Sequence, residues 1–510
     1  MTARRLTLAV CAAALAACGP PPPVTSGGIA PQRALAGAIL RDDRVTLSRG
    51  TVVRAVGVSR RWVYAATADA VIVYDRDRRA WLAPFSRDGG FEPSLVRAIA
   101  VDPDDDSAWL LTATGAWSLQ PFTAFVTRAP AGPLPARARV GSLDAVYREF
   151  PSLQSFAPLL TRDAATLQGY AVIAGARAPD RTEVWLGTAG GGLLQVDPLF
   201  SRATPVPYGL AVSGVGAMAR AADGVWMAPA SRALEPRSAI TFVTADLQQW
   251  RWVDDAARGG FGGGRATALA VHGGTMWMGT TRGLFRLAVD GTGARAFTPM
   301  AGLPSDVVLS LLVRDDGVWV GTERGLVFLP SDSAGASAAR ALQAGVADVP
   351  VRALLATGDT LWIGTEAGLV LRPPGADGRV VRPAASALSS RLRQGVRALA
   401  RADSMVFVAM PDGVMAFSLA RGAWSEPWPA VAWGTVGEIG TMAADARTVW
   451  VGGAFGVLAV DRATGVYRIL HAGSDLPDVV TSLVLDGDHA WIATLGGVVR
   501  VRRSADGLFP

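Results

Sequence analysis

The chain has 510 residues, half of them hydrophobic, and a formal net charge of +6 whose basic side comes entirely from arginine. It contains 3 histidines and 2 cysteines, and Cys11 and Cys18 both lie at the N-terminus. The mature chain is therefore expected to hold no disulfide, no thiolate metal site and no cysteine nucleophile. No run of basic residues with interleaved aromatics predicts nucleic-acid binding, and neither a metal nor a cofactor is expected.

The N-terminus has the layout of an export signal. Arg4 and Arg5 precede an apolar run that ends in small residues, and this run is too short to remain as a membrane-spanning helix. Residues 1–17 are therefore predicted to be a signal peptide. The sequence LAAC, Leu15–Cys18, resembles a bacterial lipobox, in which the cysteine receives a diacylglycerol, so Cys18 is the candidate site of lipid attachment. The alternative is an ordinary signal peptide that is cleaved nearby.

The residues after the signal predict where the mature chain resides. Gly19, in place of Asp, implies transfer of a lipidated protein to the outer membrane of a Gram-negative cell, where the chain would face the periplasm or the cell surface. Residues 18–33 include four consecutive prolines and predict a stiff tether rather than a fold. The membrane is thus an expected partner, reached through the N-terminal lipid.

A repeated hairpin motif fills residues 34–510. In VWVGTERGLVF, Val318–Phe328, two short apolar segments flank a polar connection in which Gly325 can adopt the positive φ that closes a tight hairpin. Because Val318, Trp319 and Val320 place apolar side chains on both faces, each sheet must be covered on both sides. The aromatic residue of the motif recurs at Tyr64, Trp109, Trp185, Trp226, Trp277, Trp319, Trp362, Phe407, Trp450 and Trp491.

The spacing of the copies predicts the fold. From Trp277 onward the aromatic positions are 42, 43, 45, 43 and 41 residues apart by subtraction of their numbers, within the ~40 to 50 residues of a four-stranded propeller blade. The predicted fold class is all-β, a single multi-bladed β-propeller of four-stranded blades, with about ten copies and eight to ten blades. The last copy ends at Val501 without an outer strand, so RVTLS from Arg44 is predicted to complete that blade.

Residues 128–168 interrupt the repeat. The step from Trp109 to Trp185 is 76 residues, about 30 more than a blade requires. Ser142 is a predicted N-cap, and apolar residues follow at helical spacing. A small helical insertion is therefore predicted, either a plug that packs on the propeller or a docking element. The apolar residues are Leu143, Val146, Tyr147 and Phe150.

Two long stretches carry a family resemblance. GLPSDVVLSLLVRDDGVWVGTERGLVFL, Gly302–Leu329, and SDLPDVVTSLVLDGDHAWIATLGGVVRV near the C-terminus resemble the repeat of the two-component regulator propeller family. The resemblance implies a propeller; the family's role as a sensory part of larger signalling chains is not carried over, because no kinase or response regulator follows. More weakly, VIVYDRDRRAW from Val71 and VLAVDRATG from Val457 are similar to repeats of quinone-cofactor propellers and of outer-membrane assembly lipoproteins.

The hairpin turns of the copies predict a binding face. Turns between the second and third strands of all blades must emerge at one end of a propeller, together with the linkers between blades. Loops on a rigid scaffold commonly bind partners, and aromatic and arginine side chains contribute most to interfaces. The alternative for each residue is an ordinary solvated turn. The predicted face comprises Arg282, Glu323, Arg324, Glu366, Asp412 and Phe455 in turns, with Trp428 and Trp433 in a proline-rich linker.

Two functions from different classes fit this chain. The favoured one is a scaffold or sensor module that binds a protein or carbohydrate ligand, which needs no catalytic side chains. The other is an extracytoplasmic propeller enzyme, a polysaccharide lyase, a hydrolase or a quinone-dependent dehydrogenase. Such an enzyme requires reactive side chains that converge at one mouth of the channel. No catalytic residue is assigned, since His272 and His489 are placed at turns of different blades.

Overall fold

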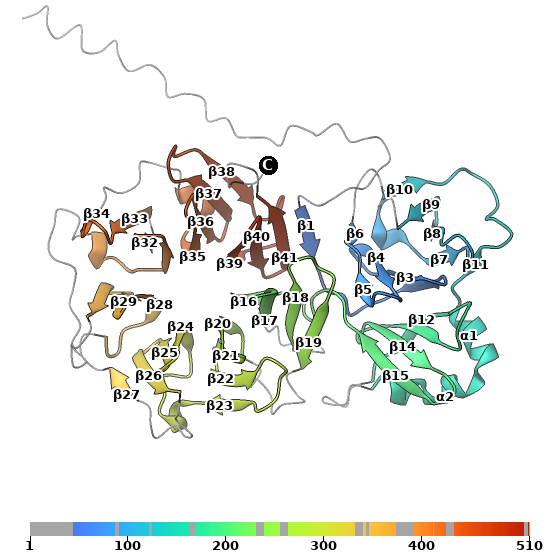
Figure 1. Ribbon diagram of the computed structural model, residues 1–510, viewed down its shortest axis with the longest axis horizontal. Coiled ribbons are helices and arrows are strands. Elements are labelled where there is room, and N and C mark those ends of the chain that lie inside the picture. Colours follow the sequence, from blue (N-terminus) through green and yellow to red (C-terminus); the bar gives the residue numbers. More distant parts are fainter. Residues whose placement is uncertain are drawn as a thin grey trace, which may run out of the picture. The chain divides into compact units, whose positions relative to one another are not determined.

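The computed structural model describes residues 44–508, apart from 87–90, 122–124, 163–168, 231–238, 255–263, 332–339, 343–345, 374–390, 412, 425–432 and 504–507. The predicted signal peptide, Cys18 and the predicted tether lie outside these residues. Within the described part the chain forms ten antiparallel sheets, and each aromatic of the repeat stands in the second strand of one sheet. The prediction of an all-β propeller-type fold is confirmed (Figure 1).

Seven of these sheets contact one another in a circle, and we call them the ring. The first strand of each sheet contacts the first strand of the next, and β39 contacts β16, so the last sheet meets the first. Thr481 Oγ1 donates a hydrogen bond of 2.6 Å to the Val215 carbonyl across this junction. In sheet order the strands are β16 Val215–Arg220, β17 Gly224–Pro229, β18 Ala239–Thr244 and β19 Trp250–Asp254; β20 Ala266–His272, β21 Thr275–Thr280, β22 Gly283–Ala288 and β23 Arg295–Phe297; β24 Val308–Arg314, β25 Gly317–Thr322, β26 Gly325–Pro330 and β27 Arg340–Leu342; β28 Val351–Thr357, β29 Thr360–Thr365 and β30 Gly368–Arg372; β31 Ala398–Ala402, β32 Met405–Met410, β33 Gly413–Ser418 and β34 Ala423–Trp424; β35 Ile439–Ala444, β36 Thr448–Gly453, β37 Gly456–Asp461 and β38 Tyr467–His471; β39 Val480–Asp486, β40 His489–Thr494 and β41 Gly497–Arg502.

The Gly-Thr pair of the repeat motif shapes the hairpin and the joint to the next sheet. Thr322 Oγ1 donates a hydrogen bond of 2.9 Å to the Gly325 carbonyl, and Gly325 adopts a φ of 114°. Gly321 must lack a side chain, because a Cβ there would lie 2.6 Å from the Val351 carbonyl oxygen of the next sheet. The buried ring of Trp319, two residues earlier in β25 and therefore on the same face, packs in one apolar cluster with Val351. The motif therefore serves close packing between sheets.

The N-terminal strand completes the last sheet of the ring. Strand β1, Arg44–Leu47, pairs antiparallel with β41, and Arg44 lies opposite Val501. The predicted pairing of the RVTLS segment with the last strand is confirmed. A strand from the beginning of the chain thus joins the end of the repeat array, and this covers an edge that would otherwise expose unpaired backbone groups.

Three further sheets lie between β1 and the ring in the sequence, and we call them the insertion. Their first strands pack together, because β2 contacts both β7 and β12. The circle of contacts thus holds seven sheets instead of the eight to ten expected, since three copies of the same motif pack on each other. The strands are β2 Ala55–Val58, β3 Trp62–Ala66, β4 Ala70–Asp75, β5 Ala80–Trp81 and β6 Phe85–Ser86; β7 Ala98–Val101, β8 Ala108–Thr112, β9 Gly115–Gln120, β10 Phe125–Arg128 and β11 Arg139–Val140; β12 Val172–Arg177, β13 Val184–Thr188, β14 Leu193–Asp197 and β15 Arg202–Val206.

Two chain segments cross where the insertion leaves and rejoins the ring, and we call this crossing the neck. The Gly50 N–H donates to the Leu210 carbonyl at 3.1 Å, and the Leu210 N–H donates to the Ser48 carbonyl at 2.9 Å. A Cβ on Gly50 would lie 1.8 Å from the Tyr208 carbonyl oxygen, and Gly209 adopts a φ of 68°. Glycine is therefore required on both segments for them to approach this closely.

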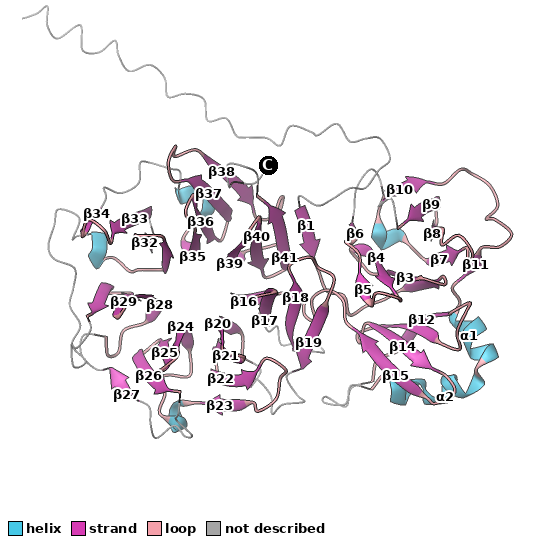
Figure 2. Ribbon diagram, viewed as in Figure 1, coloured by secondary structure: helices cyan, strands magenta, loops and turns pink. Residues whose placement is uncertain are grey.

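The predicted helical insertion is present as two short helices, α1 Leu143–Glu149 and α2 Pro151–Leu160 (Figure 2). Ser142 caps α1 as predicted, because its side chain accepts a hydrogen bond from the Ala145 N–H. Val146 and Leu153 are buried with residues of β13 and β14 in one apolar cluster. The helices thus pack on the third sheet of the insertion.

Among the residues that the structure describes, every helix is too short or too polar to cross a membrane.

Candidate functional site

Two charged residues of the predicted face of the ring lie in joints between sheets. Arg324, in the β25–β26 turn, forms a salt bridge of 3.6 Å with Asp348, which precedes the next sheet. Glu366, in the β29–β30 turn, pairs with Arg352 and Arg397. The turns therefore hold the linkers that follow them. Arg282 and Glu323 lie exposed in equivalent turns, whereas Asp412 and Trp428 fall outside the described residues.

The environment of Glu366 keeps it ionised. Burial acts to raise the pKa of this carboxyl, but the hydrogen bonds and charges of Arg352 and Arg397 outweigh burial and hold the pKa below its ordinary value. Arg397 also pairs with Glu438, so the joint spans the linkers of two further sheets. An ion-pair network of this kind is a structural device, and its charges are already matched.

Of the aromatic residues of the predicted face that the structure describes, one side chain is exposed and one is buried. Phe455 is 62% exposed in the β36–β37 turn, where a Cβ on Gly437 would contact its ring at 3.1 Å. Trp433 is only 6% exposed and belongs to the apolar core between the β31 and β35 sheets. The expectation that Trp433 contributes to a binding surface is therefore corrected: its side chain packs beside Gly413 in the core.

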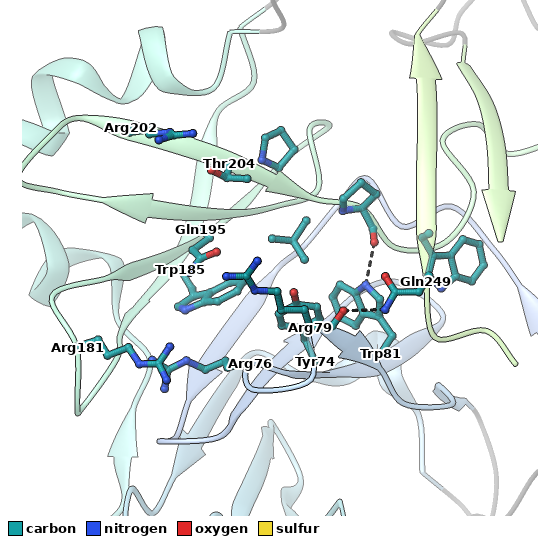
Figure 3. A pocket seen from close by; sticks show the side chains of 14 residues that line it. Tyr74, Arg76, Arg79, Trp81, Arg181, Trp185, Gln195, Arg202, Thr204 and Gln249 are labelled. Atoms are coloured by element: carbon teal, nitrogen blue, oxygen red, sulfur yellow. Dashed lines mark hydrogen bonds between the residues drawn. The ribbon is translucent and has the colours of Figure 1, made fainter. Parts of the chain in front are cut away.

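A second site, which the sequence did not predict, lies between the insertion and the ring. An open cavity of about 450 Å³, which we call the seam cavity, is lined by three sheets: the first and third of the insertion and the first of the ring (Figure 3). Cavities between packed units are common ligand sites. The lining residues are Tyr74, Arg76, Arg79, Trp81, Arg181, Trp185, Gln195, Arg202, Thr204, Pro205, Val206, Pro207, Gln249 and Trp250.

Aromatic rings form one wall of the seam cavity. Tyr74 packs against Trp81 and Trp185, with ring centroids 5.0 Å and 5.7 Å apart, and Tyr208 packs against Trp81 and Trp250 at 4.8 Å and 5.1 Å. The Trp81 indole donates a hydrogen bond of 2.9 Å to the carbonyl of residue 207. Burial raises the pKa of both Tyr74 and Tyr208 above the ordinary value, so both phenols are neutral at physiological pH. The wall is therefore closely packed and uncharged.

Two arginines of the seam cavity are occupied by neighbouring carboxylates. Arg76 forms a salt bridge of 2.8 Å with Asp180 and another of 2.5 Å with Glu183. Arg181 pairs with Asp180 at 3.3 Å and with Asp77 at 3.5 Å. Burial acts to raise the pKa of Asp180, but the hydrogen bond and charge of Arg76 lower it overall. Arg76 and Arg181 are therefore held in place by ion pairs, and their charges are matched within the protein.

Two other arginines, Arg79 and Arg202, present free positive charge to the seam cavity. Neither forms an ion pair with any residue in the described part of the chain, and both side chains are exposed. Arg79 has a φ of 52°, and its carbonyl accepts a hydrogen bond of 2.9 Å from Gln249 Nε2 of the ring (Figure 3). Ser201, directly before Arg202, has a φ of 49°. Both arginines thus belong to turns with left-handed backbone.

The turn that carries Arg79 has a close counterpart in the ring. Asp75 Oδ1 accepts hydrogen bonds from the two following turn N–H groups at 3.0 Å and 2.9 Å, and Arg79 is the left-handed residue. Asp461 accepts in the same way at 3.0 Å and 2.8 Å, and there Gly465 is left-handed with a φ of 71°. Arginine therefore stands where the ring places glycine, at a cost of about 1 kcal/mol. The arginine at this turn position is the feature of the sequence that could have indicated this site.

The chemistry of the seam cavity is that of recognition. It offers unmatched guanidinium groups, the amides of Gln195 and Gln249, the hydroxyl of Thr204 and an aromatic wall. Glu183, beside the cavity, already accepts hydrogen bonds from Arg76, Trp185 and Gln195. Within the described residues, no group of three or more His, Cys, Asp or Glu side chains is arranged to hold a metal ion.

Comparison with known proteins adds no family. No family model matches the chain, and no curated protein matches its sequence. The structure is similar to the extracellular domain of a protein named as a hybrid two component system of B. thetaiotaomicron, with 12% identity, a TM-score of 0.48 and coverage of 88% of this chain and 56% of that one. The match thus spans little more than half the length of that chain.

Two other solved structures are similar at the same level. The WD40 β-propeller domain of Doa1 has 13% identity and a TM-score of 0.43 over 58% of this chain and 95% of that chain. The computationally designed Ika8 protein has 13% identity and a TM-score of 0.38 over 90% and 99%. At these values the similarities carry no inference about function. The resemblance of the repeats to the two-component regulator propeller family stays a resemblance.

Proposed function

We propose that this protein is an exported, lipid-anchored propeller scaffold that binds a ligand in the seam cavity. The observation that carries the proposal is the cavity itself, where two unmatched arginines face a closely packed aromatic wall at the junction of three sheets. Binding sites of small ligands are typically concave, largely preformed and lined by aromatic groups with a few placed polar groups. The seam cavity has these properties, whereas Arg324 and Glu366 in the turns of the ring pair with neighbouring linkers.

The location follows from the N-terminal sequence. Arg4, Arg5 and the apolar run supply an export signal, and Cys18 follows small residues as in a bacterial lipobox. A lipid on Cys18 and a proline-rich tether would hold the propeller close to a membrane surface. The outer membrane is proposed because Gly19 follows the cysteine.

Ligand binding is tested with a cavity-blocking variant. Thr204, exposed on β15, can be replaced by tryptophan to fill the seam cavity without changing the core. A library of saccharides, amino acids and organic acids is screened by thermal shift on wild type and Thr204→Trp. A compound that raises the melting temperature of wild type alone supports the proposal. A library without such a compound, or equal shifts in both proteins, contradicts it.

The anchor is tested independently of the cavity. Metabolic labelling with palmitate should mark the wild-type protein and should be lost completely in Cys18→Ala, which should then fractionate with soluble proteins. Unlabelled wild-type protein would contradict the lipid anchor, and it would leave the binding proposal to its own experiment.

A further inference from the structure

We infer that the ligand of the seam cavity is an acidic oligosaccharide, whose carboxylate groups pair with Arg79 and Arg202. This inference rests on the proposed function and specifies its ligand. It depends on three features of the cavity: the distribution of charge, the kind of neutral groups that line it, and the backbone of the turns that carry the two arginines.

The charge distribution calls for an anion. Asp77, Asp180 and Glu183 all pair with Arg76 or Arg181, so the acidic groups near the cavity are used within the protein. Asp197, opposite Arg202 in the β14–β15 pair, accepts hydrogen bonds from the N–H groups of Leu199 and Phe200. Within the described residues Arg79 and Arg202 form no ion pair, and guanidinium groups bind carboxylates with directed, charge-assisted hydrogen bonds.

The two cations are separated in the fold, which favours a ligand with more than one acidic group. Arg79 belongs to the β4–β5 turn in the first sheet of the insertion, and Arg202 begins β15 in the third sheet. Both line one cavity of about 450 Å³. A chain of two or three acidic sugar units offers carboxylates at intervals along its length, and such a ligand can reach both guanidinium groups at once.

The neutral lining favours a hydroxylated ligand. The lining also includes the amides of Gln195 and Gln249 and the hydroxyl of Thr204, which can donate and accept hydrogen bonds. Tyr74, half-buried at the aromatic wall, presents an apolar surface next to these polar groups. Sugar rings carry both an apolar face and a rim of hydroxyl groups, so they match this alternation better than a purely aliphatic acid does.

The backbone at Arg79 supports a role in binding. A non-glycine residue in the left-handed region is strained, and such strain is found where function requires a particular side chain. Gln249 of the ring fixes the Arg79 carbonyl, so the guanidinium is presented from a turn that both the insertion and the ring hold in place. Glycine, which the ring uses at the same turn position, would relieve the strain but would remove the charge.

The test compares an acidic with a neutral probe by isothermal titration calorimetry. The trisaccharide of galacturonic acid is expected to bind wild type at least about tenfold more tightly than the trisaccharide of galactose. Arg79→Gly and Arg202→Gln are each expected to weaken the acidic probe by about tenfold and to leave the neutral probe unchanged. Arg468→Gln, on the exposed outer strand β38 of the ring, is the matched control and should change neither affinity.

The outcomes separate this inference from the proposed function. Three outcomes would overturn the inference that the ligand is an acidic oligosaccharide: equal affinities for the two probes, full affinity in both arginine variants, or no binding of either probe. The proposed function would still hold if another compound binds wild type but not Thr204→Trp. If the acidic probe binds Thr204→Trp as tightly as wild type, the seam cavity is not its site, and both proposals fall. Circular dichroism and melting temperatures of all variants confirm that they are folded.

Discussion

The ring and the insertion are built from the same hairpin motif, but the turn residues differ between the two regions. In the ring, the Asp461 turn closes with Gly465, and the charged turn residues Arg324 and Glu366 pair with neighbouring linkers. In the insertion, the equivalent turn closes with Arg79, whose charge is unmatched within the described residues. We interpret this departure from the Asp461 turn as a position that serves an external partner.

The difference extends to the way the two regions are joined. Consecutive sheets of the ring meet through first strands and through glycines such as Gly321. The insertion meets the ring at the neck and around the seam cavity, where the Trp81 N–H donates to the Gln248 carbonyl and the Gln249 side chain donates to the Arg79 carbonyl. A ligand in the seam cavity would contact both regions, so binding is expected to stiffen their junction.

The largest effect on stability is expected from Trp433→Ala in the ring. Removal of this buried ring should lower the free energy of unfolding by about 3 to 5 kcal/mol, and ligand binding in the seam cavity should be unchanged. Urea unfolding and calorimetry measure the two quantities. A stable variant that has lost its ligand would show that Trp433 serves recognition, as the sequence first suggested.

The neck should be the most sensitive point of the junction. Gly50→Ala places a Cβ 1.8 Å from the Tyr208 carbonyl oxygen, so the crossing segments must separate. We expect a loss of about 3 kcal/mol and faster proteolysis within the insertion. Gly434→Ala, at an open position of the ring, is the control and should change stability by less than about 0.5 kcal/mol. Equal behaviour of the two variants would contradict the role given to the neck.

Exchanging the left-handed residues of the two turns sharpens the comparison between the regions. Gly465→Arg should destabilise the ring by about 1 kcal/mol, because it introduces left-handed strain. Arg79→Gly should leave stability unchanged or raise it by up to about 1 kcal/mol, and only this variant should lose ligand affinity. Melting curves of both variants decide the point; a destabilised Arg79→Gly would mean that the arginine serves the fold.

The smallest effect is expected at the Glu366 joint, and it depends on pH. The folded pKa of Glu366 is depressed, so its contribution to stability is present above the ordinary carboxyl pKa and is lost as pH falls through the folded value. Glu366→Gln should therefore cost up to about 1 kcal/mol at pH 7 and much less in acid. Urea titrations at both pH values test this, and an equal cost at both would contradict the ionic joint.

Much of the fold could be predicted from the repeat, because its signals are local. The aromatic recurs in ten copies, with Gly or Ala two residues later in nine of them, and the unpaired end of the last copy at Val501 called for the Arg44 segment. The division into ring and insertion is not local. The Trp185 copy carries the same motif as the Trp319 copy, and only contacts between first strands show that one belongs to the insertion and the other to the ring.

The site was harder to predict, because it also depends on contacts between residues that are distant in the sequence. The binding face was predicted because the hairpin turns of all sheets emerge on one side of the ring. In the structure Glu366 in one of these turns pairs with Arg352 and Arg397. Such pairing depends on which sheets meet in three dimensions, which the sequence of one turn does not show. The seam cavity joins residues as distant in sequence as Tyr74 and Trp250. The one local signal was arginine in place of glycine at residue 79, which a comparison of the turn sequences DRDRRAW and DRATGVY reveals.

Hydrogen–deuterium exchange with saturating trisaccharide of galacturonic acid tests most directly whether the seam cavity is the binding site. The account predicts slower exchange in peptides that cover residues 74–82, 195–207 and 247–252, which contribute to the cavity from three sheets. The turns of Arg282, Arg324 and Phe455 in the ring should exchange as they do without ligand. Protection confined to those ring turns, with none around the cavity, would contradict the account.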